Sequence, residues 1–203
     1  MVRSLHGLLA FSAALSALAG PSIAGAPNTR PAAGWELERN VDAPSYAVTE
    51  PSKTDLNIDS VVLLCEQGPQ RPVIQLRLYL SGNGPLAPVG AANLKDDPQV
   101  EIAIDKGSHP VQLLFADDFV VVADAADGAI PLVSGKLLDA LQTGRRMEFR
   151  FHYVQEAKGR TQALDATAVV DLQAGPGGAA VAAVRRCTGD SAPQVAQAPG
   201  RSR

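Results

Sequence analysis

The chain has 203 residues and a formal net charge of −3, with acidic and basic residues scattered along it. This balance gives no electrostatic case for nucleic acid or for an anionic membrane surface as the partner. Aromatic residues make up only 4% of the chain, which also counts against a base-stacking platform. The length allows one domain of about 150 residues, long enough to bury a substantial core.

The N-terminus has the pattern of a secretory signal peptide. Arg3 supplies a positive charge, and residues 8–19 form an apolar stretch that is too short to span a bilayer. Ser22 and Ala24 then form a small-x-small cleavage site, so residues 1–24 are predicted to be removed, with an uncleaved anchor as the alternative. Because no other apolar run is long enough for a membrane span, we expect a soluble protein that is periplasmic or secreted from a bacterium.

The remaining chain divides into a central domain and two ends. Residues 25–34 are rich in Pro, Ala and Gly and predict a flexible N-terminus. Residues 188–203 are polar and contain proline without periodicity, so they predict a disordered tail. The periodic segments all lie in the domain between them, residues 35–187.

The first strands are predicted around a single tryptophan and an apolar run. Trp35 is expected to anchor the core at the start of a strand over residues 35–41. Prolines interrupt residues 42–54 and predict an irregular edge segment there. Residues 60–66 then predict a short buried strand, which a turn joins to the next strand over residues 73–81.

The strand predicted over residues 73–81 has the clearest alternation in the chain, with a period of two. Its apolar face carries Ile74, Leu76, Leu78 and Leu80, and its other face carries Gln75, Arg77 and Tyr79. After a loop rich in Gly and Pro, residues 100–105 repeat this alternation and predict another strand.

Two apolar runs about Asp117 and Asp118 predict a hairpin. Short acidic side chains suit a tight turn because they bond their own backbone and tolerate a positive φ. A tight turn at this pair sets the register, so that Phe115 faces Val120 and Leu113 faces Val122.

The chain after the hairpin predicts two short helices and two strands. Ser134 has the position of an N-cap and Gly144 that of a C′ residue, with Leu137, Leu138 and Leu141 on one face between them. A second, Ala-rich helix is expected over residues 179–186. The two strands between the helices bury alternate residues, which are Met147, Phe149, Phe151 and Tyr153 in the first and Leu164, Ala166, Ala168, Val170 and Leu172 in the second.

Strands of this number and spacing predict a mainly β fold, an antiparallel β-sandwich with one or two short helices. Cys65 and Cys187 are then expected to form a disulfide, because an even number of cysteines in an oxidising compartment favours pairing. The bridge would fasten the second helix to the sheet. Two separately buried thiols are the alternative.

The histidines and paired carboxylates do not form a recognised catalytic or metal-binding pattern. His109 is expected in an exposed turn, and His152 on the polar face of its strand. The pairs Asp96–Asp97 and Asp117–Asp118 are expected to serve turns, because adjacent residues usually point apart. We therefore expect no enzyme, metal or cofactor, while a hydrolase assembled from Asp117, Asp118 or His152 is the rival hypothesis.

Five arginines are candidates for a binding patch: Arg145, Arg146, Arg150, Arg185 and Arg186. If their elements are neighbours, the patch would suit an acidic protein or a polyanionic envelope component. The alternative is a solvated rim in which Glu148 and Glu156 are interleaved with the arginines.

The order of segments in the C-terminal half resembles a known family. The segments VEIAIDKG, PVQLLF, LLDALQTGRRMEFRF and LDATAVVDL, followed by a helix of small residues, are similar to the invasion-associated locus B family of exported bacterial proteins. Family members usually carry a close cysteine pair after the residue that corresponds to Phe115, and this chain has none there. The resemblance implies a β-sandwich in the periplasm or outer envelope, without catalytic residues.

These observations predict a non-enzymatic binding module of the cell envelope, with an unknown envelope protein or polyanionic component as its partner. A purely structural envelope protein is a third possibility.

Overall fold

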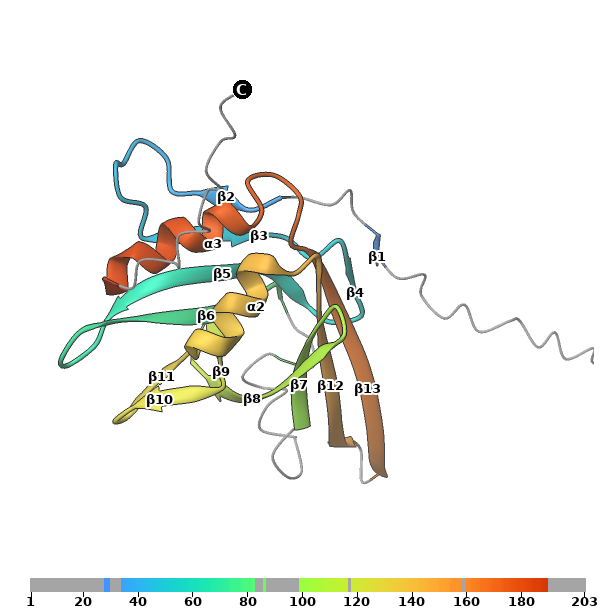
Figure 1. Cartoon of the computed structure of the whole chain (residues 1–203). Coiled ribbons are helices and arrows are strands. Elements are labelled where there is room, and N and C mark those ends of the chain that lie inside the picture. The colour runs from blue at the N-terminus through green and yellow to red at the C-terminus, as the bar shows by residue number, and fades with distance from the viewer. Residues whose placement is uncertain are drawn as a thin grey trace, which may run out of the picture.

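The computed structural model describes residues 28–29, 34–82, 86, 99–116, 118–157 and 160–189. The predicted signal peptide and most of the predicted tail lie outside these residues. In the described part, eleven strands form one antiparallel sheet in the order β1-β4-β13-β12-β7-β8-β9-β6-β5-β3-β2 (Figure 1).

One half of this sheet is built mainly from the N-terminal part of the domain. Its strands are β2 (Glu36–Leu37), β3 (Tyr46–Thr49), β5 (Ile58–Gln67), β6 (Pro72–Leu80) and β9 (Phe119–Ala123). The other half contains β1 (Asn28–Thr29), β4 (Lys53–Thr54), β7 (Gln99–Ile104), β12 (Arg146–Ala157) and β13 (Arg160–Asp171).

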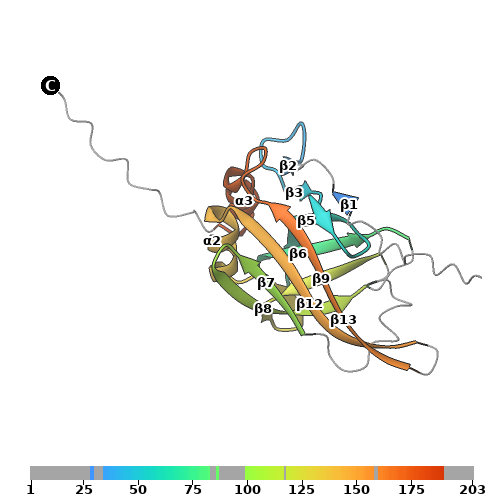
Figure 2. The same cartoon turned by 90° about the vertical axis from the view of Figure 1, so that its right-hand side faces the viewer.

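The two halves are joined by β8 (Gly107–Phe115), which belongs to both. Its first residues, Gly107 to Val111, pair with β7, and the following ones, Gln112 to Phe115, pair with β9. The sheet folds over at this strand, so that β12 and β13 run across β6 and β9 (Figure 2). The folded sheet encloses its own apolar face.

A single core lies inside the fold. Side chains from both halves of the sheet and from both helices form one buried cluster, whose members include Trp35, Leu63, Leu76, Ile102, Phe149, Leu137 and Val181. The expected inward faces are confirmed where the structure describes the side chains, because Leu76, Leu78, Phe149 and Phe151 are fully buried, although Leu80 is only partly buried. The side chains of Tyr153 and Leu164 lie outside the described residues.

Helix α2 (Gly135–Thr143) begins after the predicted N-cap Ser134, but Gly144 is its C-cap and not the C′ residue that the sequence predicts. The Ser134 hydroxyl accepts a hydrogen bond from the Leu137 N–H, and Asp124 in turn accepts bonds from the Ser134 N–H and hydroxyl. These bonds satisfy groups that a helix end leaves without partners. Gly144 follows the helix in an extended conformation, with φ −70°.

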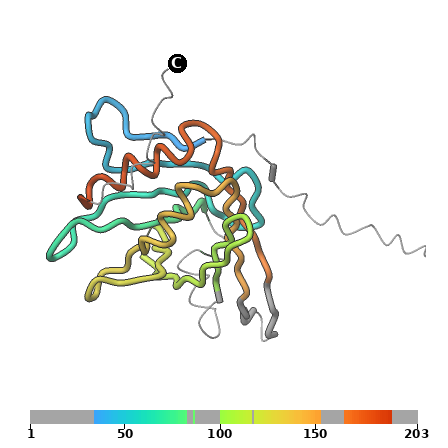
Figure 3. The backbone as a smooth tube through the Cα atoms, in the orientation of Figure 1, coloured from blue at the N-terminus to red at the C-terminus, as the bar shows by residue number. Residues whose placement is uncertain are grey.

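Helix α3 (Gly178–Arg185) continues into a short 3-10 helix, η1 (Arg186–Thr188). Figure 3 shows α3 lying along the sheet, where it contacts β3 and β5. Within η1, Cys187 is bonded to Cys65 of β5, with an S–S distance of 2.08 Å. The predicted disulfide is confirmed.

The mainly β class, the two helices and the hairpin register are also confirmed, since Leu113 pairs with Val122 and Phe115 with Val120. The finer prediction of a sandwich is not confirmed, because the main sheet is continuous through β8.

The structure adds elements that the sequence patterns did not predict. A small hairpin of β10 (Ala125–Asp127) and β11 (Ile130–Leu132) precedes α2, and the segment expected to be irregular contains β3 and β4. The strand expected from Trp35 is only two residues long. Asn28–Thr29, expected in the flexible N-terminus, pairs with β4, and Thr188, expected in the tail, ends η1.

Candidate functional site

The two halves of the folded sheet present different outer faces. Because side chains alternate along a strand, each core residue is flanked by residues that point outward. On β12 the outward residues are Arg146, Glu148, Arg150 and His152, whereas on β5 they are Ser60, Val62, Leu64 and Glu66. One outer face is therefore charged, while the other has an apolar strip on β5 that lies beside Gln75 and Arg77 of β6.

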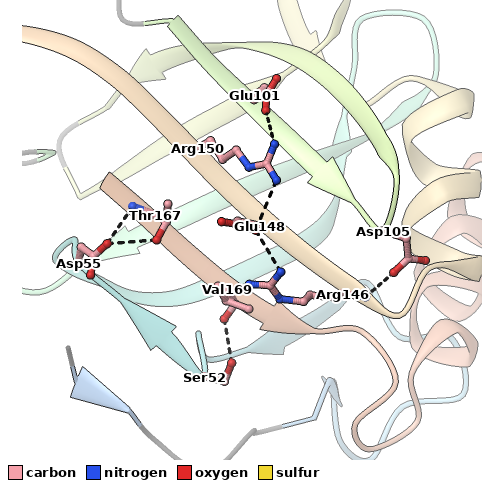
Figure 4. A network of polar contacts seen from close by, with 9 residues as sticks. All are labelled: Ser52, Asp55, Glu101, Asp105, Arg146, Glu148, Arg150, Thr167 and Val169. Atoms are coloured by element: carbon pink, nitrogen blue, oxygen red, sulfur yellow. Dashed lines mark hydrogen bonds and ion pairs between the residues drawn. The ribbon is translucent and has the colours of Figure 1, made fainter. Parts of the chain in front are cut away.

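The charged face carries a ladder of ion pairs across β7 and β12 (Figure 4). Arg146 lies 3.2 Å from Glu148, which lies 3.6 Å from Arg150, and Arg150 donates a hydrogen bond of 2.8 Å to Glu101. The Ser108 hydroxyl donates a further bond of 2.6 Å to Glu101. The bonds from Ser108 and Arg150 lower the pKa of Glu101, and the bond to Glu101 raises the pKa of Arg150. Acidic and basic groups thus neutralise each other on this face.

The polar contacts around the ladder hold strands and loops together. Asp55 accepts bonds from the Thr167 N–H and hydroxyl, and Ser52 donates to the Val169 carbonyl. These bonds attach the residues on either side of β4 to strand β13. Asp105 accepts bonds from the backbone N–H groups of Arg145 and Arg146 and closes the loop after α2. These groups have structural partners (Figure 4).

The five candidate arginines lie in two parts of the molecule. Arg145 and Arg146 line an open groove of about 430 Å³ beside β13, and Arg150 belongs to the ladder. Arg185 lies on α3, where its side chain is only 12% exposed and pairs with Asp139 of α2, and Arg186 is exposed in η1. Arg146 and Arg150 are interleaved with acidic side chains, as the solvated-rim alternative expects. The side chain of Glu156 lies outside the described residues.

The histidines have different surroundings from each other. His152 is exposed on the polar face of β12, and its Nδ1 lies 2.9 Å from a carboxylate oxygen of Asp165. His109 was expected in an exposed turn, and this prediction is wrong: it lies in β8 opposite Ile102 and is only 8% exposed. The strand begins at Gly107, two residues earlier, and its alternation turns His109 inward with Val111.

The carboxylates of the rival hydrolase hypothesis are only partly described. Asp118 is exposed at the start of the β9 hairpin, while Asp117, Asp96 and Asp97 lie outside the described residues. Within the described ranges, no group of three or more His, Cys, Asp or Glu side chains is placed to hold a metal ion. The same residues contain no helix that is both long and apolar enough to cross a membrane.

The outer face of β3, β5 and β6 contains a groove of about 390 Å³, which we call the β3–β5–β6 groove. It is lined by Ser45, Tyr46 and Val48 at β3, by Ser60, Val62, Leu64 and Cys65 of β5, and by Tyr79 of β6. Tyr46 is 40% exposed, one of the most exposed large apolar side chains in the described structure.

Strand pairing aligns the groove residues in rows. Tyr46 lies opposite Leu64, Val48 opposite Val62, and Ser60 opposite Tyr79, and directly opposite residues of an antiparallel pair share a face. The inward neighbours Val61 and Leu63 are fully buried in the core. Strand β5 is therefore apolar on both faces over residues 61–64. The core and α3 cover only one of these faces.

Charged groups border the groove on two sides. On β6, Arg77 pairs with Glu66 and lies over the Phe119 ring, 4.4 Å from its centroid. At the other border the Glu38 carboxylate accepts bonds from the Ser45 N–H and hydroxyl, which lower the pKa of Glu38.

The sequence patterns did not reveal the groove. Residues 60–66 were expected to form a buried strand, yet Val62 and Leu64 are only partly buried. The available signal was the run SVVLLC, which lacks the polar alternate residues that a strand with one solvated face normally carries. Such a run implies that something covers both faces, or that one face binds a partner.

No protein-family model, no curated protein and no solved structure matches the chain.

Proposed function

We propose that this protein is an exported, non-enzymatic binding module of the bacterial periplasm or envelope, and that its β3–β5–β6 groove receives a segment of a protein partner. The observation that carries the proposal is the groove itself: Val62, Leu64 and Tyr46 form an apolar concavity on the outer face of the sheet. Concave apolar surfaces with tyrosines are typical of protein-binding sites, because their burial releases water from apolar area.

Two features of the chain support this compartment. Its first residues have the pattern of a signal peptide, and Cys65–Cys187 is a disulfide of the kind that persists in oxidising compartments. The hypothetical relation to the invasion-associated locus B family points to the same compartment.

The charge distribution favours a protein partner over a polyanionic envelope component. A polyanion site needs uncompensated positive charge, and the ladder instead matches Arg146 and Arg150 with Glu148 and Glu101.

Site-specific photocrosslinking tests the proposal. Tyr46 is replaced by a photoreactive phenylalanine analogue in the exported protein, and adducts are compared with those formed from the same analogue at position 150 on the charged face. We expect a discrete protein adduct from position 46 that disappears when Val62→Lys is added, because a charged side chain in the groove opposes apolar contact. Circular dichroism checks that Val62→Lys folds. Absence of an adduct at position 46, or an adduct that Val62→Lys leaves unchanged, would contradict the proposal.

A further inference from the structure

The β3–β5–β6 groove has an acidic lip at its β3 end. One carboxylate oxygen of Glu38 accepts two hydrogen bonds from Ser45, of 2.8 Å from the N–H and 2.7 Å from the hydroxyl. These bonds hold the carboxylate beside a residue that lines the groove. Both bonds go to the same oxygen, Oε2, and the Glu38 side chain makes no other polar contact with the described residues. Its Oε1 atom is therefore available to a ligand.

The aromatic ring next to this carboxylate can also receive a positive charge. Tyr46 follows Ser45 directly, lines the same groove and is 40% exposed. The face of an aromatic ring carries partial negative charge and attracts a cation within about 6 Å of its centre. Tyr46 thus lines the groove together with Val48, Val62 and Leu64, and the Glu38 carboxylate lies at its edge, bonded to Ser45.

In the described part of the chain, two arginines near the groove already have partners. Arg77 at the β6 border is bonded to Glu66 and Gln75, and Arg39 pairs with Glu36 at 3.0 Å. Neither guanidinium neutralises Glu38, so the electrostatic complement of this end of the groove is a cation.

We propose that the groove selects a partner segment in which a Lys or Arg side chain adjoins aliphatic residues. The aliphatic residues lie on Val62 and Leu64, and the cation lies between the Glu38 carboxylate and the Tyr46 ring. This inference rests on the proposed function of the groove and adds the chemistry of its ligand.

Binding of defined peptides to the native, disulfide-bonded protein tests the inference. Three fluorescent, end-blocked peptides of alternating Val and Thr differ at one position, which is Lys, Gln or Glu, and their dissociation constants are measured by anisotropy. We expect the Lys peptide to bind roughly fivefold more tightly than the Gln peptide, because one exposed cation contact contributes a free energy of about that size. The Glu peptide should bind most weakly. Added salt should reduce the Lys preference.

Two matched variants assign the preference to its residue. Glu38→Gln keeps an acceptor for Ser45 but removes the charge, and it should abolish the preference for Lys over Gln. Glu36→Gln removes a nearby carboxylate that is paired with Arg39, and it should preserve the preference. Equal binding of the three peptides, or a preference for the Lys peptide that survives Glu38→Gln, overturns the inference. Neither result contradicts the proposal that the groove binds a partner segment. Failure of all three peptides to bind overturns the cation preference, and the photocrosslink at position 46 then decides separately whether the groove binds a partner.

Discussion

Gly144 and Ser134 define the two ends of α2 by different physical means. Ser134 acts through its hydroxyl, which caps the helix, and this role is visible in the sequence. Gly144 is needed because it has no Cβ atom. A Cβ atom at this position would meet the Ile104 side chain and the Ala140 carbonyl, and the φ of −70° shows that a left-handed conformation is not the reason for the glycine.

Gly144→Ala is expected to lower the free energy of unfolding by about 1–3 kcal/mol, the usual cost of adding a methyl group to a close-packed site. The measurement is a urea titration followed by circular dichroism. Gly135→Ala at the start of the same helix is the control, because a Cβ there meets nothing within 4 Å. It should be neutral or slightly stabilising. Equal effects of the two substitutions would argue against close approach as the role of Gly144.

At the scale of elements, the ladder joins β7 to β12 and makes this contact sensitive to pH. Glu101 has a pKa below its usual value because Ser108 and Arg150 bond its ionised form. Folding therefore favours the ionised form, so its stabilising contribution is present above the unfolded-state pKa. The contribution is lost as the pH falls through the lower pKa of the folded state.

Glu101→Gln should lower the urea midpoint at pH 7, with a cost of about 1 kcal/mol or less for a partly exposed pair. The difference from the wild type should shrink as the pH falls below the pKa of an unfolded glutamate, about 4.3, and vanish once native Glu101 is also protonated. Urea titrations across this pH range provide the measurement. Glu36→Gln, in an exposed pair with Arg39, should change the midpoint little at pH 7. A Glu101→Gln effect that stays constant down to pH 3 would contradict the linkage.

At the scale of the whole molecule, one covalent bond joins the first half of the sheet to the last helix. Cys65 lies in β5 and Cys187 lies 122 residues later, in η1. The bridge restricts the unfolded chain across almost the entire domain. It also lies at the β3–β5–β6 groove, since Cys65 is part of the groove lining.

Removal of both sulfurs by Cys65→Ser with Cys187→Ser should lower the free energy of unfolding by about 2–5 kcal/mol, because the unfolded chain regains the entropy of a long loop. Urea titrations with and without a dithiol reductant measure the effect. The reductant should destabilise the wild type by a similar amount and leave the double variant unchanged. Equal stability of the oxidised and reduced wild type would show that the bridge does not contribute.

Local patterns were sufficient where a structure depends on neighbours in the sequence. The alternation of Met147, Phe149 and Phe151 predicted their burial, and a turn at the pair Asp117–Asp118 predicted the register of Leu113 with Val122. Such patterns failed for His109, because the start of β8 is set by pairing with β7 and not by a local signal. They also failed for the β10–β11 hairpin, which is too short to show a period.

The sequence by itself determined the mainly β class, the inward faces of the long strands, the N-cap of α2 and the pairing of two cysteines, because periodicity, capping and cysteine number are properties of the chain. Only the tertiary structure decided that β8 bends one sheet into two halves and that α3 contacts the core side of β5. The physical reason is that a strand with two apolar faces, such as β5, does not specify which face distant elements will cover. The fold buries Val61 and Leu63 and leaves Val62 and Leu64 to form the groove.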